Sequence, residues 1–300
     1  MPYCIRIALV TVLLSGLSAS VTAEDSKARL LLDKMSHSFR ELTYQGAISY
    51  QQGDIVQSLR ITHAVIDGEE FERLEYMDGE RREIIRRGHT LSCIHPGHQL
   101  IRLYQQQQAL NQLPNSQNDS LYKLTDYYDL SVVGTGRIAN RSVVELLVRP
   151  KDAHRFIHRL SIDSQTGLLL RSIVEGSTGK VLERFQFADI QIGGAIPKEH
   201  FHARDHSYQA EHVDPVLSLS RESALNEEKP WLVNWLPGGF TAVVANQKFA
   251  SEDMATFTDG FAVFSVFLEK IDQSLLQHGV DSGGEGLARR GATVAYSRAL

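Results

Sequence analysis

The chain has 300 residues, 42% of them hydrophobic, which is enough for two globular domains with a core in each. Its 31 basic and 36 acidic residues give a net charge of −5, and no basic stripe of the kind that nucleic-acid binding requires is present. Two cysteines, Cys4 and Cys93, are too few for a disulfide framework or a zinc cage. We therefore expect no nucleic-acid partner, no metal and no other cofactor.

The first 23 residues have the pattern of a secretory signal. Arg6 precedes an apolar run over residues 7–14, and small residues follow, with Val21 and Ala23 at the positions that signal cleavage requires. The apolar run is too short to span a bilayer comfortably. We expect residues 1–23 to be removed and the mature chain to be exported.

Residues 26–42 are predicted to form an amphipathic helix, because Leu31, Met35, Phe39 and Leu42 recur every three or four residues. Strand-like runs follow, and turn dipeptides such as Asp67-Gly68 and Asp78-Gly79 separate them at intervals of about ten residues. Such intervals leave no room for crossover helices, so consecutive strands should pair antiparallel.

A polar stretch over residues 105–120 interrupts this pattern, and Ser120 can cap a short helix after it. The strand pattern then resumes over residues 130–138, 142–148, 155–162, 168–175 and 181–192. The sequence thus predicts a sheet of about ten strands. A twisted sheet of that size curls, and we expect a half-barrel, an unclosed antiparallel β-barrel whose concave apolar face is covered by the helix.

The periodic pattern fails after residue 200. Residues 201–229 mix His, Asp, Glu and Ser without a period and are predicted to be a linker. Residues 230–300 are rich in aromatic residues and are predicted to form a smaller C-terminal domain, with a glycine-rich loop at 279–291 and a further strand at 292–296. The fold class is therefore α+β, with the large half-barrel domain over residues 24–200.

Motifs typical of enzymes are not found. His200, His202 and His206 form the densest histidine group, but the HExxH helix of a zinc hydrolase is missing. The sequence GSTGK at 176–180 lacks the first glycine of a P-loop, and no serine stands in a GxSxG elbow. We expect a protein that is not an enzyme, with an envelope hydrolase that uses His200 or His206 as an alternative.

Charged residues are concentrated around the apolar pair Ile84-Ile85. This segment is either a solvated strand rim or a site that binds anions through Arg82 and Arg86. Arginines beside an apolar concave face would suit a lipid with phosphate head groups.

Ordered motifs along nearly the whole mature chain carry a family resemblance. They are Ser58-Leu59-Arg60 with His63, MDGERREIIRRG at 77–88, YYDLSVVG at 127–134, RIANR at 137–141, WLPGGF at 235–240 and Thr258-Asp259-Gly260 before a Phe-rich strand. Through them the sequence resembles the RseB/MucB family, the periplasmic negative regulators of the sigma-E envelope-stress pathway.

The resemblance implies a fold that agrees with the half-barrel. It implies a large N-terminal domain similar to the lipoprotein carriers LolA and LolB, an unclosed barrel with a helical plug, and a smaller C-terminal domain. Family members usually continue past this point with a further strand and a terminal helix, so we expect the small domain to end early at Leu300.

The resemblance also implies a function in the periplasm. Such proteins bind the periplasmic segment of a membrane-spanning anti-sigma factor, shield it from the site-1 protease, and are released by lipid, including lipopolysaccharide. A periplasmic lipid or lipoprotein carrier of the LolA/LolB type is the alternative, and the sequence leaves a homo-oligomer open. For partner binding we expect Trp235, Leu236, Pro237 and Phe240, with a core position as the competing interpretation of the tryptophan. For lipid binding we expect the concave face, with Leu59, Ile61, Leu74 and Ile173.

Overall fold

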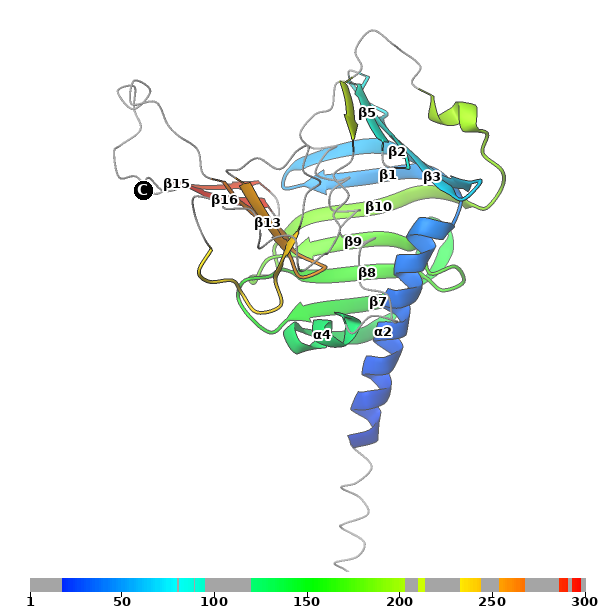
Figure 1. Cartoon of the computed structure of the whole chain (residues 1–300). Coiled ribbons are helices and arrows are strands. Elements are labelled where there is room, and N and C mark those ends of the chain that lie inside the picture. Colours follow the sequence, from blue (N-terminus) through cyan, green and yellow to red (C-terminus); the bar gives the residue numbers. More distant parts are fainter. Residues whose placement is uncertain are drawn as a thin grey trace, which may run out of the picture.

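The computed structural model, shown in Figure 1, describes residues 18–79, 81–88, 90–94, 120–202, 210–213, 233–243, 254–267, 286–290 and 293–297. Residues 1–17 of the predicted signal and the polar stretch before Ser120 lie outside the described residues. Among the helices that are described, none combines the length and the apolar character needed to cross a membrane.

The described elements, in chain order, are two α-helices, one 3-10 helix and sixteen strands. They are α2 (Ser18–Glu41), β1 (Tyr44–Gln52), β2 (Ile55–Ile66), β3 (Glu69–Tyr76), β4 (Glu83–Arg87), β5 (Thr90–Ile94), α4 (Ser120–Tyr127), β6 (Tyr128–Ile138), β7 (Arg141–Pro150), β8 (Ile157–Asp163), β9 (Leu169–Glu175), β10 (Val181–Ile192), η1 (Lys198–Phe201), β11 (Ala210–Val213), β12 (Thr241–Val243), β13 (Met254–Thr258), β14 (Val263–Phe267), β15 (Gly286–Arg290) and β16 (Thr293–Ser297).

The large domain is one antiparallel sheet in the order β11-β5-β4-β3-β2-β1-β10-β9-β8-β7-β6. Consecutive strands are neighbours within β1–β5 and within β6–β10, and the pairing of β1 with β10 joins these two halves of the meander. Asp67 and Gly68 both have positive φ, 54° and 80°, as a tight hairpin turn requires. The sheet is unclosed, since β11 and β6 stand at opposite ends of its order. The predicted unclosed antiparallel sheet with an N-terminal helix is confirmed.

Helix α2 packs on one face of this sheet, which we call the helix face. The side chains of Ala28, Leu32, Met35 and Phe39 are buried on it at the three- or four-residue spacing of a helix stripe. They join one core cluster with Leu59, Ile61 and Leu74 of the sheet. At roughly 1.5–3 kcal/mol for each large apolar side chain removed from water, this contact fixes α2 across the strands, as Figure 1 shows.

A short segment around η1 packs on the opposite, outer face of β2–β4. Phe201 is fully buried there against Phe71 at a ring distance of 5.5 Å, in a second small cluster with Ala64 and Ile85. Arg87 donates two hydrogen bonds to the carbonyl of Phe201, at 3.1 and 2.7 Å. The predicted linker 201–229 therefore starts with a core residue, and it also contains β11, which pairs with β5.

The described elements of the small domain are strands. β12, β13 and β14 form a three-stranded sheet, and β15 pairs with β16. Phe264 packs against Phe240 and Phe257, each at a ring distance of 5.1 Å. β15 lies within residues 279–291, so the prediction of a continuous loop there is wrong. Glycine enrichment indicates turns, but it does not exclude a short strand between them.

Candidate functional site at the junction of the two domains

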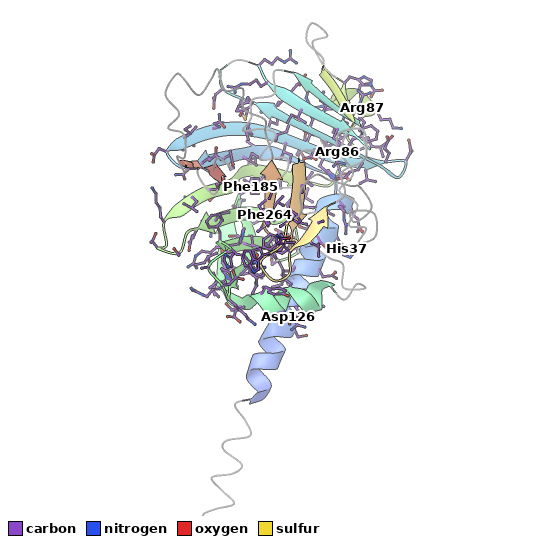
Figure 2. All side chains as sticks on the ribbon, turned by 60° about the vertical axis from the view of Figure 1, so that its left-hand side comes forward. His37, Arg86, Arg87, Asp126, Phe185 and Phe264 are labelled. Atoms are coloured by element: carbon purple, nitrogen blue, oxygen red, sulfur yellow. The ribbon has the colours of Figure 1, made fainter. Side chains whose placement is uncertain are left out.

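Three of the sequence motifs meet where the small domain touches the large one. The motif that begins YYDL lies at the end of α4 and the start of β6, WLPGGF precedes β12, and Thr258-Asp259-Gly260 begins at the last residue of β13. In Figure 2, Phe264 of the small sheet and Asp126 of α4 mark the two sides of this region. We call this contact the junction.

Arg155 of the large domain lies at the centre of the junction, in the loop between β7 and β8. Its side chain is 0% exposed, and its Nε donates to Oδ2 of Asp259 at 2.5 Å. Other guanidinium nitrogens donate to the carbonyl of Gly238 and to the carboxylate of Asp152. Burial opposes the charge, but the hydrogen bond and negative charge of Asp259 outweigh it and raise the pKa of Arg155.

Three aromatic rings surround the same guanidinium. The Cζ atom of Arg155 lies 5.0, 5.5 and 4.8 Å from the ring centroids of Tyr127, Tyr128 and Phe240. Two of these rings belong to the large domain and one to the small domain. The cation is thus bound both by polar groups and by ring faces from both domains.

Asp259 of the small domain accepts four hydrogen bonds. Its Oδ1 accepts from the backbone amides of Phe261 and Ala262, at 2.9 and 2.7 Å, which shapes the turn before β14. Its Oδ2 accepts from the hydroxyl of Tyr128 at 2.8 Å in addition to Arg155. Burial and then the charge of Asp259 raise the pKa of Tyr128, so the phenol stays protonated and donates.

The glycine pair of WLPGGF permits close contact with Tyr127. A Cβ atom on Gly238 would lie 2.8 Å from Cε1 of Tyr127, and one on Gly239 would lie 2.5 Å from its Cε2. Gly239 also has a φ of +84°, which residues with a side chain rarely adopt. The motif needs glycine here because any side chain would push the small domain away from the ring.

Phe261 inserts from the small domain into the core of the large one. It packs against Tyr128 and His158, at ring distances of 5.5 and 5.4 Å, and belongs to the core cluster that contains α2. Burial lowers the pKa of His158 to about 4, although the charge of Asp259 acts in the other direction. The imidazole is therefore neutral at neutral pH.

The residues predicted to bind a partner divide into two groups at the junction. Trp235 is 66% exposed, and its ring makes an edge contact with His154 of the large domain at 5.4 Å. Leu236 and Pro237 are half-buried. Phe240 is buried between Arg155 and Phe264. Trp235 therefore presents a free apolar surface, whereas Phe240 holds the domains together.

The residues predicted to bind lipid do not share one face. Leu59, Ile61 and Leu74 are buried on the helix face. Ile173 lies on the outer face, because its neighbour Ser172 is the residue of β9 that pairs with Phe185 and Leu160 of the helix-face cluster. Side chains alternate along a strand, so Ile173 does not share the helix face with the other three residues.

The two arginines predicted to bind anions have different environments. Arg86, labelled in Figure 2, is buried and bonds to the carboxylates of Glu70 and Glu72. Its charge is therefore already paired, so a free anion-binding role for Arg86 is not supported. Arg82 is half-buried, with its Cζ atom 4.3 Å from the ring centroid of Tyr76.

A histidine completes the charged group around Arg86. Nε2 of His63 lies 3.0 Å from Oε1 of Glu70, and Nδ1 of His63 contacts the carbonyl of Leu42 at 2.6 Å, just after α2. Burial tends to raise the pKa of Glu70, but His63 and Arg86 lower it to about 2. The group thus ties the end of α2 to the sheet.

Within the described part of the chain, no three His, Cys, Asp or Glu side chains converge as metal ligands would. His206, of the predicted histidine group, lies outside the described residues.

Sequence patterns missed the roles of Arg155, Asp259 and Tyr128. Tyr128 and Asp259 stand in motifs that carry the resemblance, but Arg155 belongs to none of them and was placed at the start of a strand. The one local signal is its position three residues before buried His158 in β8, which is too weak to indicate a buried cation.

Family models match both parts of the chain. The model described as the MucB/RseB N-terminal domain matches residues 27–204, and the MucB/RseB C-terminal domain matches residues 225–300. The sigma factor AlgU regulatory protein MucB of Pseudomonas aeruginosa is 30% identical over 301 residues, covering 98% of this chain and 89% of that protein. The sigma-E factor regulatory protein RseB of Haemophilus influenzae is 26% identical, covering 95% and 87%.

Solved structures agree with these matches. The complex of Pseudomonas aeruginosa MucA and MucB contains a chain that superposes with a TM-score of 0.66 at 29% identity, covering 91% of this chain and 88% of that one. A crystal structure of MucB superposes with a TM-score of 0.63 at 28% identity, covering 92% of this chain and 94% of that one. The relatives are regulatory proteins, and the prediction that this protein is not an enzyme is confirmed. With both of its domains matched, the chain belongs to the MucB/RseB family.

Proposed function

We propose that this protein binds the periplasmic segment of a membrane-spanning anti-sigma factor and thereby regulates a sigma factor of the sigma-E type. The observation that carries the proposal is the similarity, over both domains, to a MucB chain whose structure was solved in complex with MucA(peri), with a TM-score of 0.65 and 29% identity. The proposed location is the periplasm, which the predicted leader over residues 1–23 supports.

Trp235 is the residue that we propose to contact the partner directly. A large exposed apolar ring is costly to leave in water and is typical of the residues that contribute most to protein interfaces. Leu236 and Pro237 extend this apolar surface, whereas buried Phe240 supports it from below. Binding there would shield the segment from the first protease that cuts it.

Lipid is proposed to release the partner. Such a release requires lipid to prefer the unbound form, and the coupling must then be reciprocal. A hundredfold weakening corresponds to about 2.7 kcal/mol, which burial of about 100 Å² of acyl chain supplies. Leu59, Ile61 and Leu74 are each 1% exposed, so acyl chains would reach them only in a form whose helix face is uncovered.

A periplasmic lipid or lipoprotein carrier is the alternative function. A carrier would need only the large domain, whereas here Phe261 of the small domain is part of the large domain's core. This packing favours the regulator.

Binding can be tested with the mature chain and the purified periplasmic segment of the anti-sigma factor from the same organism. We expect retention of the segment in a pull-down, protection of the segment from its first protease, and loss of both after addition of lipopolysaccharide. Trp235→Ala should weaken binding about tenfold or more without lowering stability, because the side chain is exposed. Val263→Ala, at another exposed apolar residue of the small domain, is the matched control and should bind normally.

The outcomes separate the proposals. If the wild-type protein does not retain the segment, the regulatory function is wrong. If it retains the segment equally well with and without lipopolysaccharide, binding stands and lipid release is wrong.

A further inference from the structure

The junction contains a charged contact that has only two favourable states. The side chains of Arg155 and Asp259 are 0% and 3% exposed, and the two residues belong to different domains. If the domains separate, both groups become hydrated. If they meet, the hydrogen bonds of the guanidinium replace that water. A partly open junction would leave a charge buried without its partner, which is the costly state.

The same contact determines where the exposed tryptophan lies. Gly238, whose carbonyl accepts from Arg155, stands in the motif that begins with Trp235. His154, which contacts the ring of Trp235, is the residue next to Arg155 in the chain. The surface around Trp235 is thus made by both domains, and Arg155 is bonded to the glycine turn that joins them.

We propose that Arg155 is the positioning residue for partner binding: by bonding to Asp259 and Gly238 it places the small domain on the large one, and the partner segment binds only to this closed arrangement. The part of this inference that concerns partner binding, which we call the partner half, rests on the proposed function. Arg155 itself does not contact the partner, because its side chain is fully enclosed.

The expected size of the effect follows from population arithmetic. When only a fraction of the molecules is competent to bind, the apparent dissociation constant rises by the inverse of that fraction. If loss of the guanidinium lowers the closed fraction from near one to about one tenth, affinity falls about tenfold.

The test compares Arg155→Gln with Arg141→Gln in the mature chain. Arg141 is a matched control because its Nε and Nη2 bond to Oδ2 and Oδ1 of buried Asp163, at 2.6 and 3.1 Å, entirely within the large domain. Arg155→Lys keeps the charge but not the planar fork of donors and should give an intermediate result. Asp259→Asn removes the negative charge with little change in shape, and it replaces Arg155→Gln as the test variant if Arg155→Gln does not fold.

Three quantities are measured for each variant: amide hydrogen exchange at Phe261 and Ala262, the radius of gyration from solution scattering, and the affinity for the purified periplasmic segment. For Arg155→Gln we expect exchange at these two amides to be at least about tenfold faster, a larger radius of gyration, and binding about tenfold weaker. Arg141→Gln should leave all three quantities as in the wild type, although it lowers overall stability.

Each contrary result has a defined meaning. An Arg155→Gln protein with an open junction and normal affinity would refute the positioning role. Weak binding with normal exchange and scattering would also refute it, because Arg155 would then act by contacting the partner. If the wild-type protein does not bind the segment, the proposed function and the partner half fail together, and the exchange data alone decide whether Arg155 places the small domain.

Discussion

We expect the free energy of unfolding to decrease at acidic pH because His158 is buried in its neutral form. The pKa of His158 is lowered to about 4 by burial, against an ordinary value of about 6.5. As the pH falls below about 6.5 the unfolded chain takes up a proton on this residue, while the folded chain does not until about pH 4. The free energy of unfolding therefore decreases across this window, by roughly 3 kcal/mol at 1.36 kcal/mol per pH unit.

The assay is urea unfolding at several pH values between 7 and 4, followed by circular dichroism, for the wild type and for His158→Gln. Glutamine cannot take up a proton here, so we expect the difference between the two unfolding free energies to change by roughly 3 kcal/mol in favour of the variant as the pH falls. Parallel pH profiles for His158→Gln and the wild type would refute the argument.

Two further predictions concern packing. Phe201→Ala removes a fully buried ring between Phe71 and Ile85 and should lower the unfolding free energy of the large domain by about 3–5 kcal/mol, measured by chemical denaturation. A loss below about 1 kcal/mol would show that η1 does not contribute to the core. Gly239→Ala places a Cβ atom against Tyr127 at a positive φ, so we expect faster amide exchange at Phe261 with unchanged exchange in β2 and β3; normal exchange at Phe261 would contradict the close contact.

The large sheet could be predicted from the sequence because the signals for its strands and turns lie within short stretches of the chain. Asp67-Gly68 needs positive φ at both residues, and this chemistry specifies a hairpin wherever it occurs between strand-like runs. The predicted helix was also found, although its buried stripe contains Ala28 and Leu32, with Leu31 only partly buried beside it. A helix stripe is wide enough that spacing alone does not decide which of two adjacent leucines is at its centre.

The junction could not be predicted in this way. Arg155 and Asp259 are 104 positions apart in the chain, and no periodicity connects them. Each also stands beside turn residues, where charged side chains are usually solvated. Phe201 was missed for a similar reason: a single aromatic residue among polar ones gives no period, and its burial depends on outer-face residues such as Phe71 and Ile85 that are distant in the chain. Family motifs pointed to the right loops, but not to the contact between them.

The bulge in β6 has a consequence for self-association. β6 ends the large sheet on one side, and its pairing with β7 shifts register between Val132 and Gly134. An end strand with regular spacing would offer a template on which a second chain could add by backbone hydrogen bonding, whereas an extra residue breaks the repeat of donors and acceptors. This irregularity works against fibre-like stacking of the protein along that side at high protein concentration.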